Sequence, residues 1–184
     1  MNLHQTLSKI ILPRQLWQEI LDHCQRKLAG DFLPGESPVK RAYGILAGQK
    51  EENTFEICKV LPVKKNARNQ EPLKTYMDQT LAQHAVPSTT PLSDRGWITD
   101  PAELMACYQQ CDDENLVILG TYHMHIVPWK GDPLRDTPTR LDTVLARESN
   151  LYTFIISMVD VNAPHIRAFF EGDPNLETPI DIPD

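Results

Sequence analysis

The stretch LVILGTYHMH, residues 116–125, is the most informative part of this sequence. Leu116 to Leu119 form a short apolar run that is typical of a buried strand, and the residues up to His125 continue it. Side chains two residues apart on a strand point to the same side of the sheet. We therefore expect His123 and His125 to face one space at the end of this strand, where functional residues often lie.

Outside this strand, apolar spacing and turn residues predict a further set of helices and strands. Helices are expected over 16–28, from Asp100 and from Thr137–Pro138, and strands over 42–48, 55–63, 153–159 and 165–170. This order of elements is typical of an α/β (α+β-like) fold, in which helices flank the faces of a mixed sheet.

Two segments lack a regular period. Residues 66–97 are polar and rich in Pro, Ser and Thr, which predicts a long surface loop or an insertion with a short helix near 76–84. Residues 172–184 are acidic and rich in proline, and we expect a loose tail there. Residues 1–171 are then one domain, which agrees with a chain of 184 residues.

Composition restricts the class of protein. The chain is 41% hydrophobic and 23% charged, as in globular domains, and its net charge of −7 argues against nucleic-acid binding. No run approaches the roughly 18 apolar residues of a membrane span, and Met1 to Arg14 lack the pattern of a signal peptide. The four cysteines have no metal-binding spacing, which favours reduced thiols. We expect a cytoplasmic protein without membrane partners.

The two histidines suggest a zinc site, because zinc accepts imidazole nitrogens and carboxylate oxygens and keeps one position for water in catalytic sites. Asp132, Asp136 and Asp142 are the candidates for a third ligand. Asp142 has the best context, because it falls in the first turn of the helix after Pro138. A histidine pair can also occur without a metal, and an aspartate can simply stabilise a helix N-terminus.

The string from Gly120 to Asp142 resembles the signature of the JAMM (MPN-domain) metallopeptidases, G-x-Y-H-S-H-P followed by P-S-x-x-D. The run AYGILAG, residues 42–48, resembles the family's C-G-L-L-x-G strand, and WITDPAEL, residues 97–104, resembles its F-x-x-D-P-x-E-L helix start. Residues 153–170 resemble the terminal strand pair. The matches span most of 14–171 in the family's order.

This resemblance implies a specific fold and site. The fold would be the MPN or cytidine-deaminase-like sandwich, and Zn²⁺ would be held by His123, His125 and Asp142, with a water as the fourth ligand. Such a metal lowers the pKa of the water to about 7. Thr139 corresponds to the motif serine, and its hydroxyl would stabilise the developing oxyanion.

The sequence also departs from the family pattern. Met124 and Ile126 replace the serine and proline beside the histidines, and the loop after His125 is longer than usual. Without the extra residues Asp136 would stand at the family spacing. Asp142 is preferred because Pro138 and Thr139 precede it in pattern.

The most consequential departure concerns the general acid/base. The family's glutamate position holds Arg41, a permanent cation that cannot accept a proton from a zinc-bound water. Glu36, in the loop just upstream, would replace this glutamate if the loop folds back over the metal. It could equally be a solvated loop carboxylate.

Three functions remain open at this point. The first is a zinc peptidase or isopeptidase of the JAMM type, acting on a ubiquitin-like or sulfur-carrier protein near its C-terminus. The second is a non-catalytic module that binds a protein partner, which the Arg41 substitution favours. A zinc hydrolase of small molecules is the third. In each case residues 66–97 and 126–138 are expected to flank the metal cleft.

Overall fold

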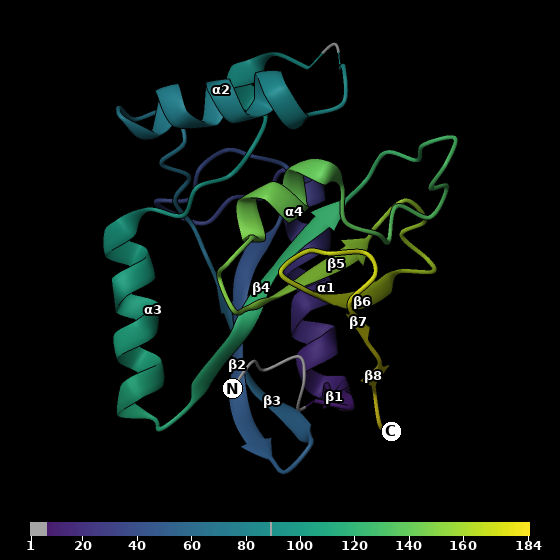
Figure 1. Ribbon diagram of the computed structural model, residues 1–184. Helices are drawn as coiled ribbons and strands as arrows, with labels where there is room; N and C mark the ends of the chain where they lie inside the picture. Colours follow the sequence, from purple (N-terminus) through teal and green to yellow (C-terminus); the bar gives the residue numbers. More distant parts are fainter. Residues whose placement is uncertain (1–6, 89) are drawn as a thin grey trace.

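A computed structural model describes residues 7–88 and 90–184 (Figure 1). Its helices are α1 (Arg14–Ala29), α2 (Leu73–His84), the short 3-10 helix η2 (Leu92–Asp94), α3 (Pro101–Asp113) and α4 (Arg140–Ala146). Its strands are β1 (Lys9–Ile11), β2 (Tyr43–Glu51), β3 (Thr54–Pro62), β4 (Val117–His125), β5 (Tyr152–Ser157), β6 (His165–Phe170), β7 (Glu177–Thr178) and β8 (Ile180–Asp181). Residues 1–6, which hold the start of the domain predicted from residue 1 and the first part of the segment judged not to be a signal peptide, lie outside the described residues.

All eight strands belong to one mixed sheet with the order β7-β6-β5-β4-β2-β3-β1-β8. Strands β7 and β8 stand at its opposite ends, since β7 pairs with β6 and β8 pairs with β1. Only Pro179 separates these two strands along the chain. The two edges of the sheet must therefore come close together, and the sheet curls into a nearly closed barrel.

The predicted architecture, an α/β sandwich of the MPN or cytidine-deaminase type, is wrong. The protein is mostly sheet, and its strands curl into the barrel-like form described above instead of forming a layer between helices. The physical reason lies in the short strands β1, β7 and β8, which add an edge at each side and bring the edges together. Segments of two or three residues carry no periodicity that a sequence pattern could detect.

The tail from residue 172 is part of this sheet. Leu176, Ile180 and Ile182 pack against the main core, and the buried Thr178 hydroxyl bonds the Tyr152 hydroxyl at 2.8 Å. These apolar side chains, spaced between prolines, provide enough burial to order the segment. The expectation of a loose tail is therefore corrected.

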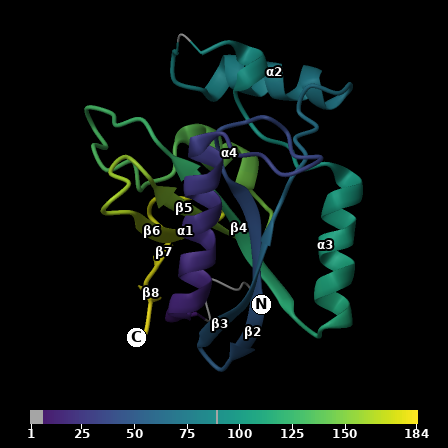
Figure 2. The ribbon, with the colours of Figure 1, turned by 180° about the vertical axis from the view of Figure 1, so that it is seen from behind.

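Helices pack on two separate apolar clusters. α1 buries Ile20 and Cys24 in the main core, and Figure 2 shows it in front of the strands when the molecule is seen from behind. α3 packs Cys107 and Cys111 against a smaller cluster built on β2, β3 and β4. As predicted, Asp100 caps α3, accepting hydrogen bonds from the backbone N–H groups of Ala102 and Glu103.

The insertion at 66–97 contains the helix predicted near 76–84, observed as α2. Both ribbon views place α2 at the same end of the sheet as the carboxyl end of β4 (Figures 1 and 2). None of the helices in the described part of the chain has the length and apolar character that a membrane crossing requires.

Candidate metal centre

The two histidines stand at the end of β4, between β2 and β5. His123 pairs with Tyr43 of β2, and His125 pairs with Ser157 of β5. The intervening Met124 and the preceding Tyr122 point to the other side, where both belong to the main core. Alternation along β4 thus anchors the strand on one face and presents two imidazoles on the other, as the sequence predicts.

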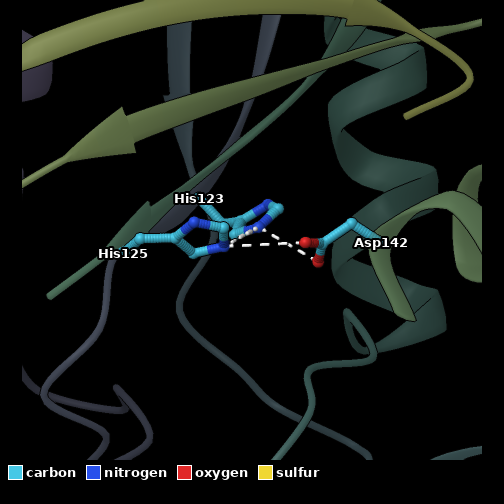
Figure 3. Close-up of side chains that lie close together, drawn as sticks. All are labelled: His123, His125 and Asp142. Atoms are coloured by element: carbon cyan, nitrogen blue, oxygen red, sulfur yellow. Dashed lines mark hydrogen bonds and ion pairs between the residues drawn. The ribbon is translucent and has the colours of Figure 1, made fainter. Parts of the chain in front are cut away.

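Asp142 joins the two histidines from the first turn of α4 (Figure 3). The Nε2 atoms of His123 and His125 lie 3.1 Å apart. His123 Nε2 is 3.3 Å from Asp142 Oδ1, and His125 Nε2 is 3.6 Å from Asp142 Oδ2. One ligand atom from each residue can be chosen so that all three lie within 4.8 Å of one another.

The state of His125 follows from its two ring nitrogens. Nδ1 lies 3.1 Å from the carbonyl oxygen of Arg135, which can only accept a hydrogen bond, so Nδ1 carries the proton. Burial lowers the pKa of His125, against the opposing effect of Asp142, so the ring is neutral near pH 7. Its Nε2 then presents a lone pair to the Asp142 carboxylate. Two electron-rich atoms at this distance repel unless a cation lies between them.

The Asp142 carboxylate is fixed by a capping box. The Thr139 N–H donates to Asp142 Oδ2 at 2.6 Å, and the Thr139 hydroxyl accepts from the Asp142 N–H at 3.2 Å. Burial opposes ionisation of this carboxyl, yet the neighbouring His123 holds its pKa well below the usual range. Thr139 also lines the cavity, so its hydroxyl hydrogen remains available to a bound molecule.

The other two aspartates considered as ligands have different partners. Asp136 pairs with Arg167 at 3.2 Å. Asp132 accepts a hydrogen bond from the Thr137 hydroxyl at 2.6 Å and lies 3.5 Å from Arg135. The structure therefore brings Asp142, and neither of these carboxylates, to the histidine pair.

An aromatic stack supports His123 from the side. The ring of Tyr43 is stacked on His123, with centroids 5.8 Å apart, and Trp97 is stacked on Tyr43 at 4.3 Å. Burial raises the pKa of Tyr43 to about 12, so its hydroxyl stays protonated. Both aromatic residues occur in the quoted motifs, but no spacing rule indicates that they meet each other and His123.

Arg41 lines the same cavity as the three candidate ligands. Tyr43 pairs with His123, and the Met124 N–H donates to the Ala42 carbonyl at 3.3 Å, so the antiparallel register places Arg41 next to His125. Arg41 also hydrogen-bonds the Tyr43 hydroxyl. Arg41, at the position where the JAMM pattern has glutamate, thus lines the same cavity as the three candidate ligands.

Glu36 does not lie where the expected role of general base would require it. Its carboxylate binds Arg26 at 2.7 Å and lies 3.7 Å from Lys27, and the side chain is 1% exposed. The hydrogen bond from Arg26 holds the pKa of Glu36 at about 2. Glu36 is absent from the residues that line the cavity. A carboxylate this acidic and this firmly paired is a poor general base, so the structure gives no support to that role.

The ligands open into a cavity of about 710 Å³. Residues 85–88, 90 and 95–97 line one part of it, and 126–127, 129 and 135 line another. The expectation that both long segments flank the site is therefore confirmed. Among the described lining residues, Asp142 is the carboxylate and Arg41, Arg95 and Arg135 are the permanent cations.

Comparisons with known proteins identify the fold alone. No family model matches the chain, and no curated protein matches it. Among solved structures, the chain is similar to protein DSY2949 from Desulfitobacterium hafniense, with a TM-score of 0.61 and 20% sequence identity. The similarity covers 95% of this chain and 93% of that chain. A likeness of this kind extends over the whole domain and carries no information about the chemistry of the site.

Proposed function

We propose that the protein is a zinc-dependent hydrolase that cleaves a peptide or isopeptide bond, as the resemblance to JAMM metallopeptidases implies. The observation that carries the proposal is the convergence of His123, His125 and Asp142 around one point, with the lone pair of His125 directed at a carboxylate. Without a cation this arrangement is electrostatically unfavourable, and with one it is a common ligand set.

The three residues fit zinc in chemistry as well as in position. Two neutral imidazoles and one carboxylate are a known catalytic ligand set, and three protein ligands leave one position for water. Hydrogen bonds from His125 Nδ1 to the Arg135 carbonyl and from the Thr139 N–H to Asp142 fix the orientation of these two ligands. When bound, zinc would polarise a substrate carbonyl and lower the pKa of a ligated water.

The side chains around the ligands define what the protein itself contributes. Thr139 can donate its hydroxyl hydrogen to an oxygen that becomes negatively charged during cleavage. No described lining residue other than Asp142 offers a carboxylate for proton transfer to the leaving nitrogen. General acid/base catalysis is typically worth about 10²–10⁴-fold, so we propose slow or narrowly selective turnover.

The proposed substrate is the C-terminal segment of a ubiquitin-like or sulfur-carrier protein, in line with the family resemblance. Such a segment is extended and could enter a cavity walled by Val86, Val127 and Leu145, which are all partly exposed. We also propose a cytoplasmic location, to which the unpaired state of all four cysteines is suited.

The test is hydrolysis by zinc-loaded protein of peptides and ubiquitin-like proteins that end in a glycine pair extended by a reporter group. Cleavage should stop after treatment with a chelator, return on adding zinc, and be absent from D142N. Asp136→Asn is the matched control, since Asp136 lies outside the ligand set and pairs with Arg167. Cleavage that survives in D142N would refute the proposal.

A non-catalytic zinc-binding module is the second candidate. It is favoured by Arg41 beside the ligands and by the ion-paired state of Glu36. This function predicts stoichiometric zinc, no turnover of any substrate in the panel, and capture of an intact partner protein. Zinc content measured together with turnover distinguishes the two candidates.

A further inference from the structure

The cavity differs in charge from the rest of the molecule. The whole chain has a net charge of −7, yet the described lining of the cavity contains three arginines and one aspartate. A metal ion on the three ligands would make the cavity more positive still. A positive cavity in an acidic protein concentrates anions at that point of the surface.

Two of the three arginines have a clear structural task. Arg135 is 6% exposed, lies 3.6 Å above the Trp129 ring, donates to the Val127 carbonyl and lies 3.5 Å from Asp132. Arg95 donates to the Val86 carbonyl at 2.7 Å and so ties down the segment after α2. Both therefore hold the walls of the cavity.

Arg41 has no comparable task. Its partner in the described part of the chain is the neutral hydroxyl of Tyr43, and no described carboxylate forms an ion pair with it. Arg41 and Arg135 are both permanent cations, and both line this cavity. Two like charges that face one cavity are relieved by an anion between them.

We propose that Arg41 binds an anionic group of the substrate, a carboxylate or a phosphate, next to the metal-bound part of that substrate. The inference rests on the proposed metal site and narrows the substrate class. The guanidinium presents paired N–H donors that match either oxyanion. Because Arg41 is the cross-strand neighbour of His125, this group lies within one side-chain length of the metal ligands. The preferred substrate thus carries its negative charge close to the bond that is cleaved.

The experiment measures binding, so it does not depend on turnover. Zinc content is determined first, and three hydroxamates are then titrated into zinc-loaded protein by calorimetry. They are the monohydroxamate of succinic acid, its uncharged methylamide and phosphonoacetohydroxamate, which share the metal-binding group and differ in the distal charge. Circular dichroism checks the fold of each variant. R41A and R41K are compared with Lys40→Ala, which removes an equal charge from an exposed neighbour outside this cavity.

The wild type should bind the two anionic compounds at least about tenfold more tightly than the methylamide. Whichever of the two gains more identifies the anion as carboxylate or phosphate. R41A should lose this preference for anionic compounds and keep its affinity for the methylamide. R41K should keep part of the preference, and K40A should behave as wild type.

Other outcomes overturn the inference. Three results would each show that Arg41 does not bind the anionic group. They are equal binding of all three compounds by the wild type, a preference for anions that persists in R41A, and binding of all three compounds by R41A that is weaker by the same factor. In those cases methylamide binding by the wild type leaves the metal site standing. Absence of zinc, or of any hydroxamate binding, would refute the metal site and the inference with it.

Discussion

The behaviour of single residues in this protein depends on which groups meet their polar atoms. His125 donates from Nδ1 to a carbonyl, so its Nε2 is left as a lone pair beside Asp142. Glu36 has a carboxylate of the same chemical type, but Arg26 and Lys27 surround it. One carboxylate is therefore available to a metal, and the other is committed to holding a loop to α1.

Removing any one ligand should abolish zinc binding. We expect wild-type protein to retain about one zinc per chain after dialysis, and His123→Ala, His125→Ala and Asp142→Ala to retain far less, since three protein ligands are the minimum for such a site. Metal content by atomic emission is the measurement, with Asp136→Ala as the control. If D142A retained zinc and D136A lost it, Asp136 would be the third ligand instead of Asp142.

Glu36→Gln should lower stability and leave zinc content unchanged. Breaking a buried ion pair by removing one charge typically costs about 3–5 kcal/mol, and here the uncompensated cations are Arg26 and Lys27. Urea unfolding at pH 7 measures the loss. Glu114→Gln, in the more exposed pair with Lys59, is the matched control and should change the free energy of unfolding far less.

Ionisation of Glu36 makes the stability of the fold depend on pH. The folded pKa of Glu36 is about 2, below its ordinary value of 4.5, so its stabilising effect is complete above pH 4.5 and is lost as the pH falls towards 2. Wild type should thus lose stability over this range more steeply than E36Q. Parallel stability curves for the two proteins would contradict the assignment.

Sequence patterns predicted the three candidate ligands His123, His125 and Asp142, because a strand period and a helix start are local features. They could not predict the neighbours of those ligands. Tyr43 stacks on His123, and Trp97 stacks on Tyr43, only because the β2–β4 register and the insertion bring these rings together. The pairing of Glu36 likewise depends on how the 31–41 loop folds against α1, and no local pattern encodes that.

At the scale of elements, the short helix α4 carries one residue of the candidate metal site, so its stability bears on that site. It has seven residues, too few to be stable by itself, and its first turn carries the ligand Asp142. The capping box with Thr139 fixes both the helix start and the carboxylate orientation. The sequence predicted this helix, but placed its start at Thr137–Pro138 instead of at Arg140.

Thr139→Ala should therefore weaken zinc binding as well as the helix. Loss of the hydroxyl cap costs about 1 kcal/mol, and loss of an orienting neighbour typically reduces metal affinity about 10–100-fold. Thr139→Ser keeps the hydroxyl and should restore both. Zinc affinity by competition with a chromogenic chelator is the measurement. Equal affinities for T139A and T139S would show that the cap does not orient Asp142.

At the scale of the whole molecule, the sheet curls into a nearly closed barrel, which the sequence patterns did not predict. The long strands β2 to β6 were predicted from their apolar runs, and they alone suggest an open sheet with helices on its faces. Residues 9–11 and 180–181 form the short strands β1 and β8 at one edge of the sheet, and residues 177–178 form β7 at the opposite edge. The position of the candidate metal site is unaffected by this error, because its two histidines lie on β4 in the middle of the sheet.

This arrangement predicts that the C-terminal segment supports the whole fold and leaves the metal site intact. Thr178→Ala removes the buried hydrogen bond to Tyr152. Ending the chain after Leu176 removes this bond and also the backbone bonds between β8 and β1. In these bonds the N–H groups of Ile10 and Leu12 donate to the carbonyls of Pro179 and Asp181, at 2.9 and 2.8 Å. We expect losses of about 1–3 kcal/mol for T178A and more for the shortened chain, because buried groups lose their partners. Urea unfolding measures both, and zinc content of the folded T178A protein should remain about one per chain. Asp184→Asn, which alters only an exposed pair with Arg14, should have little effect. A shortened chain that unfolds at the wild-type urea concentration would show that the barrel does not depend on its closure.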